Sequence, residues 1–170
     1  MATYPTIPAG QRLTAAFLRS MLPIFAKKLA NEDRSATTTL ADDSELILPL
    51  EANASYHVRI FIHYAAISAA GFQMAWSTPA GASGSRWALG SGPSQTSATD
   101  VGGRFGVHSF GTAVRYGDRA STSLFMGALE EGVIDTTNAG TLALQWSQAV
   151  SNASPARIAA GSFMQLQRLA

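Results

Sequence analysis

A regular alternation of apolar and other side chains over residues 55–65 constrains the fold more than any other feature of the sequence. One set of alternate positions is uniformly apolar and consists of Tyr56, Val58, Ile60, Ile62 and Tyr64. Successive side chains of a β-strand point to opposite faces, so this period of two predicts a long strand with one buried face. The opposite face is mixed and consists of His57, Arg59, Phe61 and His63.

The same period recurs along the chain after residue 37, separated by polar and glycine-rich turns. Further strands are predicted over residues 45–50, 71–77, 104–116, 122–129, 140–150 and 161–169. Pro49 cannot donate a ladder hydrogen bond, which assigns the first of these strands to a sheet edge or a bulge. Several strands without interleaved helices predict an antiparallel arrangement, and about eight strands suit a jelly roll. We therefore predict a mainly β protein, an antiparallel jelly-roll-like β-sandwich.

The N-terminal part of the chain follows a different pattern. Residues 1–8 contain two prolines and no periodicity, which predicts an extended arm. Residues 10–22 have helical spacing and end before Pro23, which cannot continue a helix straightforwardly. The apolar side of this short helix is formed by Leu13, Phe17, Met21 and Leu22. We predict an N-terminal arm and helix over residues 1–35, for anchoring or assembly, and a β-sandwich domain over residues 36–170.

A helix of about three turns is marginal alone in water, so its apolar side must dock on something. Two partners are consistent with the sequence. The helix either packs on the β domain of its own chain, or it packs on a neighbouring subunit or a larger structure.

The composition favours self-assembly over interaction with nucleic acid or membrane. Charged residues make up only 14% of the chain, against about 25% in ordinary soluble domains, so copies repel one another weakly. The net charge of +1 and the scattered basic residues do not provide the clustered cations that nucleic acid requires. Apolar stretches fall short of the roughly 20 residues of a membrane span. The chain contains no cysteine, which removes disulfides and thiolate chemistry.

Mixed strand faces indicate where copies of the chain would meet. Interfaces resemble ordinary surface with aromatic anchors, whereas a core excludes charged groups. The polar face of residues 55–65 and the alternating positions of the last strand have this mixed character. The predicted subunit interface is formed by His57, Arg59, Phe61, His63, Phe163, Gln165 and Gln167.

No pattern in the sequence predicts catalysis, a metal or a cofactor. There is no Gly-x-Ser-x-Gly elbow between a strand and a helix. His57 and His63 share a strand face but lie roughly 20 Å apart by strand rise, too far for one metal ion. Residues 42–45 are acidic but lack the alternation and glycine of a calcium loop, so a solvated turn is predicted there. We predict a non-enzymatic protein without cofactors.

The tryptophans divide into two classes. Trp76 and Trp146 lie in alternating strands and are predicted to be core residues. Trp87 follows Arg86 beside a stretch rich in glycine and serine, where an exposed indole could stack on a sugar ring. Loops on a rigid sandwich commonly carry recognition, so residues 81–97, with Arg86 and Trp87, are the predicted ligand-contact loop. The expected ligand is a glycan.

Several short stretches carry a family resemblance that spans nearly the whole chain. They are residues 8–14 (PAGQRLT), 37–46 (TTTLADDSEL), 50–56 (LEANASY), 75–81 (AWSTPAG), 140–146 (GTLALQW) and the segment from Gly161 to Leu169. These resemble minor structural proteins, of the minor tail type, from tailed phages and prophages of actinobacteria. The C-terminal segment also looks like the closing strand of trimeric jelly rolls of the complement C1q and tumour necrosis factor type.

The resemblance implies a virion subunit, made in the host cytoplasm, that forms a homotrimer and binds other phage virion proteins. The leading expectation is a tail-associated assembly or adhesion subunit, of the minor tail or fibre type, whose ligand would be a host cell-surface glycan. The alternative is a capsid decoration protein that cements the phage head and binds no host ligand. A host-encoded soluble binding protein is a third option. The matched stretches mark strands and turns and transfer no binding-site residue.

Overall fold

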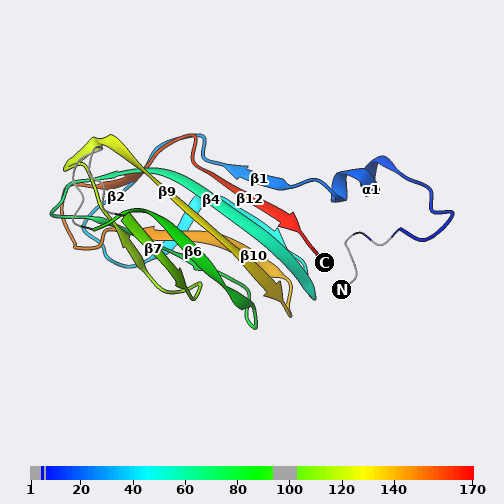
Figure 1. Cartoon of the computed structure of the whole chain (residues 1–170). Coiled ribbons are helices and arrows are strands. Elements are labelled where there is room, and N and C mark those ends of the chain that lie inside the picture. The colour runs from blue at the N-terminus through cyan, green and yellow to red at the C-terminus, as the bar shows by residue number, and fades with distance from the viewer. Residues whose placement is uncertain (1–4, 6, 94–102) are drawn as a thin grey trace.

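Two antiparallel sheets packed face to face form the body of the protein, with a short helix on an arm beyond one end (Figure 1). This computed structural model describes residues 5, 7–93 and 103–170. The elements in chain order are α1 (Ala15–Ser20), β1 (Ile24–Lys27), β2 (Glu32–Arg34), β3 (Ala41–Leu50), β4 (Ala54–Ala66), β5 (Phe72–Ser77), β6 (Ser83–Ser91), β7 (Gly103–His108), β8 (Val114–Tyr116), β9 (Ser121–Thr136), β10 (Gly140–Ser147), β11 (Ala156–Ile158) and β12 (Phe163–Arg168).

The connections between the sheets follow the jelly-roll pattern. Sheet A has the order β1-β12-β4-β9-β6-β7, and in the same sheet β11 pairs with β4 and β2 pairs with β11. Sheet B has the order β3-β10-β5-β8. From β3 onward the chain passes to the other sheet at almost every connection, the exceptions being the paired strands β6 and β7 and the adjacent β11 and β12. The predicted fold class, a mainly β, jelly-roll-like sandwich preceded by an arm and a short helix, is therefore confirmed.

The inward face of β4 anchors the core between the two sheets. Val58, Ile60 and Ile62 are fully buried, as the alternation predicted. On sheet B the ring of Phe72 stacks on Tyr64 of β4 with centroids 4.4 Å apart, and lies 5.9 Å from Trp146. A further set of core side chains comes from the facing strands and includes Leu46, Met74, Trp76, Tyr116, Ile134, Leu142, Leu144, Met164 and Leu166. Trp76 and Trp146 are thus core residues, as predicted.

The N-terminal region departs from the predicted boundaries. The helix is only six residues long, because it begins where Thr14 caps the amide of Phe17 and ends before Pro23. No residue of α1 is buried, so tertiary packing does not extend it. Strands β1 and β2 pair with β12 and β11. Residues 24–34, predicted to belong to the arm, are therefore part of the sandwich.

Most predicted strands are present, and two assignments were wrong. Residues 104–116 form two strands, β7 in sheet A and β8 in sheet B, joined by a turn. Residues 83–91 of the predicted loop form β6, which pairs with both β7 and β9; residues 94–97 of that loop lie outside the described residues. Pro49 does lie in an edge strand, because β3 ends sheet B.

A buried ionic cluster ties β1 and β2 of sheet A to β3 of sheet B. The Nζ of Lys28 lies 2.9 Å from Asp43, and both side chains are fully buried. Asp43 also accepts the indole N–H of Trp146 at 3.0 Å and the amide of Leu46 at 2.9 Å. The solvated turn predicted over residues 42–45 is therefore wrong, because these residues belong to β3 and one of the carboxylates faces the core.

Glu32 joins this cluster from the solvent side. Burial raises the pKa of its carboxyl, but hydrogen bonds from Lys28, Ser44 and Arg34 outweigh burial and lower that pKa to about 2. The guanidinium of Arg34 also donates to the carbonyls of Ala41 and Asp42, and lies 4.2 Å from the ring centroid of Trp146. Charge and hydrogen bonds thus hold β2 against the opposite sheet.

Replacing Lys28 by Met should destabilise the protein by about 3–5 kcal/mol, because it leaves Asp43 as a buried charge without its cation. Urea denaturation followed by tryptophan fluorescence would measure the free energy of unfolding. The matched control is Arg157→Met, which breaks the more exposed pair with Asp33 and should cost about 1 kcal/mol or less. Equal costs for the two variants would contradict the role given to the buried cluster.

Glu32 should also make stability depend on acid pH. A carboxyl whose pKa is lower in the folded state stabilises above its ordinary value of 4.5, and the effect disappears as pH falls through about 2. The free energy of unfolding should therefore fall more steeply between pH 4.5 and pH 2 in the native protein than in Glu32→Gln. If the free energy of unfolding of the two proteins changed with pH in the same way, the hydrogen bonds assigned to the Glu32 carboxylate would be wrong.

Candidate functional site

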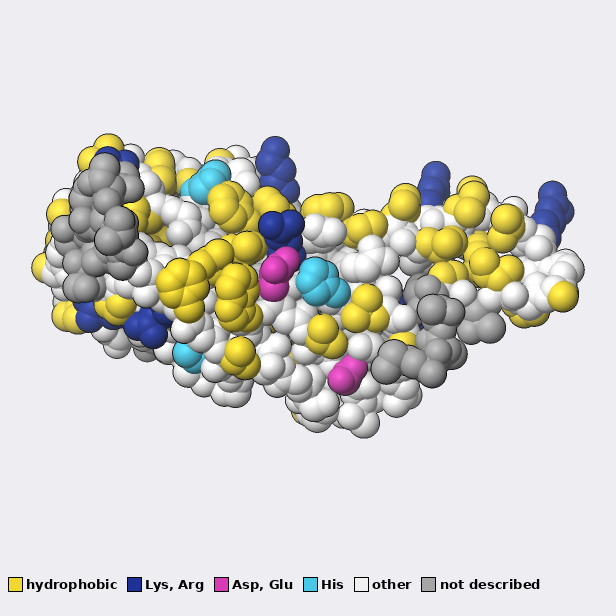
Figure 2. Space-filling view, in the orientation of Figure 1, with side chains coloured by type: hydrophobic (Ala, Val, Ile, Leu, Met, Phe, Trp, Pro, Cys, Tyr) yellow, Lys and Arg dark blue, Asp and Glu magenta, His cyan; other side chains and the backbone are white. Residues whose placement is uncertain are grey.

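The outer face of sheet A is a mixed surface that extends across the paired strands β1, β12, β4, β9, β6 and β7. It carries apolar side chains around a small group of charged and histidine side chains, and Figure 2 views it in the same orientation as Figure 1. The outward positions of β4 form its centre, because their neighbours Val58, Ile60 and Ile62 point into the core. The register of the strands then defines which side chains lie in line across this face.

One line of outward positions is apolar across five strands, and we call it the transverse stripe. Phe61 of β4 is opposite Phe163 of β12 on one side and Leu129 of β9 on the other. Leu129 is opposite Leu89 of β6, which is opposite Phe105 of β7. The ring centroids of Phe61 and Phe163 are 5.8 Å apart. Phe105 is 70% exposed, so the stripe ends in an uncovered aromatic ring.

The adjacent line combines charge with apolar ends. Arg59 is opposite Glu131, with Nε 3.3 Å from the carboxylate, and the Nε2 of His57 lies 3.8 Å from the same oxygen. Beyond Glu131 the line continues to Trp87 and Val107. Side chains of this pair are one-third to one-half exposed, so water screens the pair and it adds little to stability.

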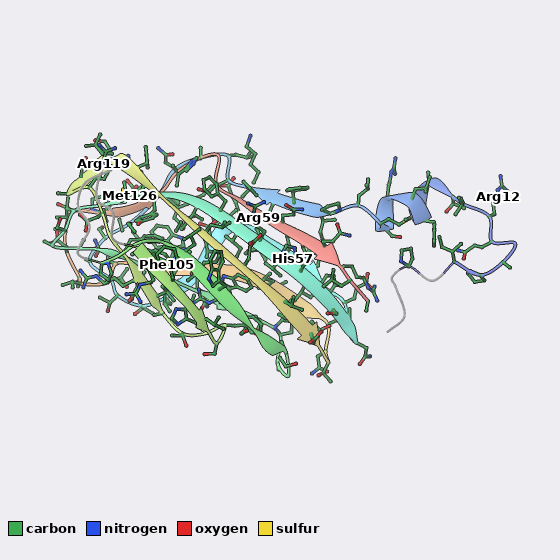
Figure 3. All side chains as sticks on the ribbon, viewed as in Figure 1. Arg12, His57, Arg59, Phe105, Arg119 and Met126 are labelled. Atoms are coloured by element: carbon green, nitrogen blue, oxygen red, sulfur yellow. The ribbon has the colours of Figure 1, made fainter. Side chains whose placement is uncertain are left out.

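The residues predicted as a subunit interface are brought together on this face. His57, Arg59, Phe61 and His63 project outward from β4 (Figure 3 labels the first two). Phe163, Gln165 and Gln167 are opposite Phe61, Arg59 and His57. The structure thus gathers two separate segments of sequence into one surface. Their role in assembly stays a prediction.

Arg86 occupies a different place from the predicted one. It is fully buried on the inner side of β6 and forms an ion pair with Glu130, which is also fully buried. Its Nε donates to the carbonyl of Phe110 at 3.2 Å, and the hydroxyl of Tyr116 donates to Glu130 at 2.7 Å. Burial raises the pKa of Tyr116, with the nearby Glu130 adding to the effect. Arg86 therefore belongs to the core and cannot contact an external ligand.

Trp87 is the outward neighbour of Arg86, because alternate residues of β6 face opposite sides. Its side chain is 36% exposed and lies in the sheet rather than in a loop. Together with Val107 and Val133 it lines a hollow of about 460 Å³ that also includes His57, Glu131 and Asp135. We call this hollow the Trp87 groove. The strands approach closely here, since a Cβ at Gly84 would lie 2.2 Å from the carbonyl oxygen of Val133.

A second hollow lies on the same sheet and has a volume of about 660 Å³. It is lined by Phe61 and His63 of β4, by residues 125–127 of β9, and by Asn31, Ala159 and Ala160. His63 packs edge-on against Phe61, with centroids 4.9 Å apart. This hollow adjoins one side of the transverse stripe and adds to the uneven apolar relief of the face.

The predicted anchor residues lie on the arm and remain uncovered. Leu13 is 57%, Met21 40% and Leu22 63% exposed, while Phe17 is partly buried. Figure 1 shows α1 beyond the end of the sandwich, and the Nε2 of Gln167 donates to the carbonyl of Met21 at 3.3 Å. The end of the arm borders a hollow of about 270 Å³ that Arg19, Ser20 and Leu22 line together with Leu50 and Leu166 of the β domain, yet no residue of α1 is buried.

Several residues of this face were not predicted from the sequence. Leu89, Phe105, Val107, Leu129 and Glu131 join it only through pairing with β4 and β6. A strand was predicted over residues 122–129, so part of β9 was visible in the sequence. Which face of that strand looks outward, however, depends on a register that no local pattern fixes.

In the described ranges 5, 7–93 and 103–170, no three His, Asp or Glu side chains are grouped so that they could hold a metal ion. The described part of the chain also has no helix that is both long and apolar enough to cross a membrane. No protein-family model matches this sequence, and no curated protein is significantly similar to it.

Adjacent substitutions on β6 should have opposite consequences. Arg86→Met should lower the free energy of unfolding by about 3–5 kcal/mol, because Glu130 loses its buried partner. Trp87→Ala, one residue away, should cost about 1 kcal/mol or less, since it removes a partly exposed side chain from the outer face. Thermal and urea unfolding would measure both. If Arg86→Met cost little stability and Trp87→Ala cost much, the orientation assigned to β6 would be the wrong way round.

Proposed function

We propose that this protein is a virion structural subunit that assembles with copies of itself, as a homotrimer, through the outer face of sheet A. The observation that carries the proposal is the transverse stripe, an apolar line across five strands whose members are partly exposed and which ends in the uncovered ring of Phe105. Contiguous apolar surface of this kind is uncommon on monomeric proteins and marks interaction sites.

The chemistry of the face suits a second copy of the same chain. Phe61 and Phe105 supply aromatic anchors, which dominate the energetics of interfaces. The neighbouring line carries both signs of charge, in Arg59 and Glu131, so it offers a group of opposite sign to either charge on another copy. A net charge of +1 adds little repulsion between copies. A face of this composition can therefore be buried against itself without leaving a large uncompensated charge.

The assignment to a virion, and within it to the tail, rests on the sequence resemblance to minor tail-type proteins of actinobacterial phages. The exposed arm supports it, because a tail-associated subunit needs an attachment segment separate from its folded head. In this proposal the protein is made in the host cytoplasm and reaches the virion by assembly with other phage proteins. A glycan contact at Trp87 would compete with assembly for the same face, so we give assembly priority.

Capsid decoration is the second candidate, and one observation favours it. Leu13, Leu18, Met21 and Leu22 are exposed, and no residue of α1 is buried. A decoration protein would use such a segment to grip the surface of a shell. Immunogold labelling of intact particles distinguishes the two locations, because gold at the tail supports the first assignment and gold on the head supports the second.

Replacing Phe61 by Glu should dissociate the assembly, because it introduces a charge in the middle of the transverse stripe. Sedimentation velocity should show the native protein at three times the chain mass of 17.8 kDa and the variant at that mass. Leu29→Glu is the matched control, since Leu29 is 77% exposed and lies outside this face. A native protein that stays monomeric at every concentration would refute the proposal.

A further inference from the structure

We infer that the N-terminal arm of one copy, residues 12–22, docks in the Trp87 groove of a second copy. This inference rests on the proposed function and names the contact that links neighbouring subunits. It joins two surfaces that the single chain leaves uncovered. One is the apolar side of the arm, and the other is an apolar hollow with acidic residues in its lining.

The arm has the features of a docking segment. Its helix is shaped before docking, because Thr14 caps the amide of Phe17 and the hydroxyl of Ser20 donates to the carbonyl of Phe17 at 2.7 Å. Leu18 is 51% exposed and Leu22 is 63% exposed, and they lie four residues apart on one side. A formed helix with uncovered apolar side chains loses little further entropy when it binds.

The arm is also purely basic. Arg12 and Arg19 are its charged residues, and the sequence has no acidic residue before Glu32. Two such arms would repel each other, so contact between arms is disfavoured. A complementary surface must instead supply carboxylates beside an apolar floor.

The Trp87 groove supplies both. Its floor contains Trp87, Val107 and Val133, of which Val107 is 68% exposed and Val133 43% exposed. Glu131 and Asp135 are also among its lining residues and make it acidic. Among the described residues Asp135 has no ion-pair partner, and Glu131 pairs with groups that are themselves partly exposed.

The spacing of the charges on the two surfaces is similar. Glu131 and Asp135 are four residues apart on one strand, which corresponds to about 13 Å. Arg12 and Arg19 are seven residues apart, which corresponds to about 10 Å in a helix. The separation is larger here, because Arg12 precedes the first helical residue, Ala15. Both arginines could therefore reach these carboxylates while the apolar side chains between them face the floor.

The direction of the arm favours a second copy over the groove of the same chain. The arm enters the sandwich at β1, and two strands, β12 and β4, separate β1 from β9. It leads away from the sandwich, and Arg12 lies far from the labelled residues of the outer face (Figure 3). To reach its own groove the arm would have to reverse at Pro23. An arm that docks on the next copy makes a head-to-tail contact, which closes into a ring such as a trimer.

Photo-cross-linking would identify the partner of the arm. The chain contains no cysteine, so Ala16→Cys provides a single site for a thiol-reactive benzophenone. Equal amounts of unlabelled and 15N-labelled full-length protein are mixed, allowed to exchange, irradiated and digested. The expected products join the arm to peptides of β6, β7 or β9 and contain both isotopes. Groove cross-links within one isotope only, or arm-to-arm products, would overturn the inference.

Charge reversal tests the pairing directly. The double variants Arg12→Glu with Arg19→Glu, and Glu131→Lys with Asp135→Lys, should each weaken association at least about tenfold. An equal mixture of the two variants should recover association in part, because in a mixed trimer two of the three arms then meet a groove of opposite charge. Arg119→Glu is the matched control, since Arg119 lies at the end of the sandwich far from the arm (Figure 3), and it should leave association unchanged. Failure of the mixture to recover association would contradict the pairing.

The outcomes separate this inference from the proposed function. If Phe61→Glu dissociates the protein but cross-links never join the arm to the groove, self-assembly stands and the docking inference fails. If the full chain is monomeric and yields no mixed-isotope product, both fail.

Discussion

Strand β4 can turn only one of its two faces into the core, and this constraint organises the rest of the molecule. With Val58, Ile60 and Ile62 inside, the side chains of Arg59 and Phe61 must lie outside. A slip of one residue would bury a guanidinium and expose three apolar side chains, so the register is strongly specified. Because β4 pairs with β12 and β9 over most of its length, the same choice sets the outer faces of its neighbours.

The buried ion pairs show where sequence analysis reaches its limit. The apolar alternation predicted most strands and the class of the fold, because burial depends on local periodicity. Lys28 and Asp43 looked like ordinary surface residues, since a charged side chain is expected outside unless its partner is known. The two residues pair with each other although they are fifteen residues apart in sequence and lie on opposite sheets. The predicted ligand contact of Arg86 was wrong for the same reason. Its partner Glu130 lies on β9, which pairs with β6 only in the folded protein.

The candidate site was predicted in part, for a reason that follows from the same geometry. Residues 57–63 and 163–167 were selected because mixed faces are poor cores, and the antiparallel register makes these two segments neighbours. The contribution of β6, β7 and β9 was missed, because β6 was predicted to be a loop and the sequence does not show which strands share a sheet. The arm was recognised as an unsupported apolar helix, but its length was overestimated. The helical spacing of apolar residues extends to positions before Thr14, but the helix itself begins only after Thr14, which is its N-cap.

The placement of charge explains how one sheet can be stable alone and still be available for assembly. The two buried ion pairs lie between the sheets and contribute to the integrity of the single domain. The exposed pair of Arg59 and Glu131 contributes little to that stability, so it can exchange partners at small cost. In the proposed assembly, folding and association therefore draw on different residues. A partner can therefore determine the composition of an outer face that contributes little to the stability of the domain. Because the arm is basic and the whole chain is nearly neutral, carboxylates such as Asp135 remain elsewhere on the chain and could bind the arm of another copy.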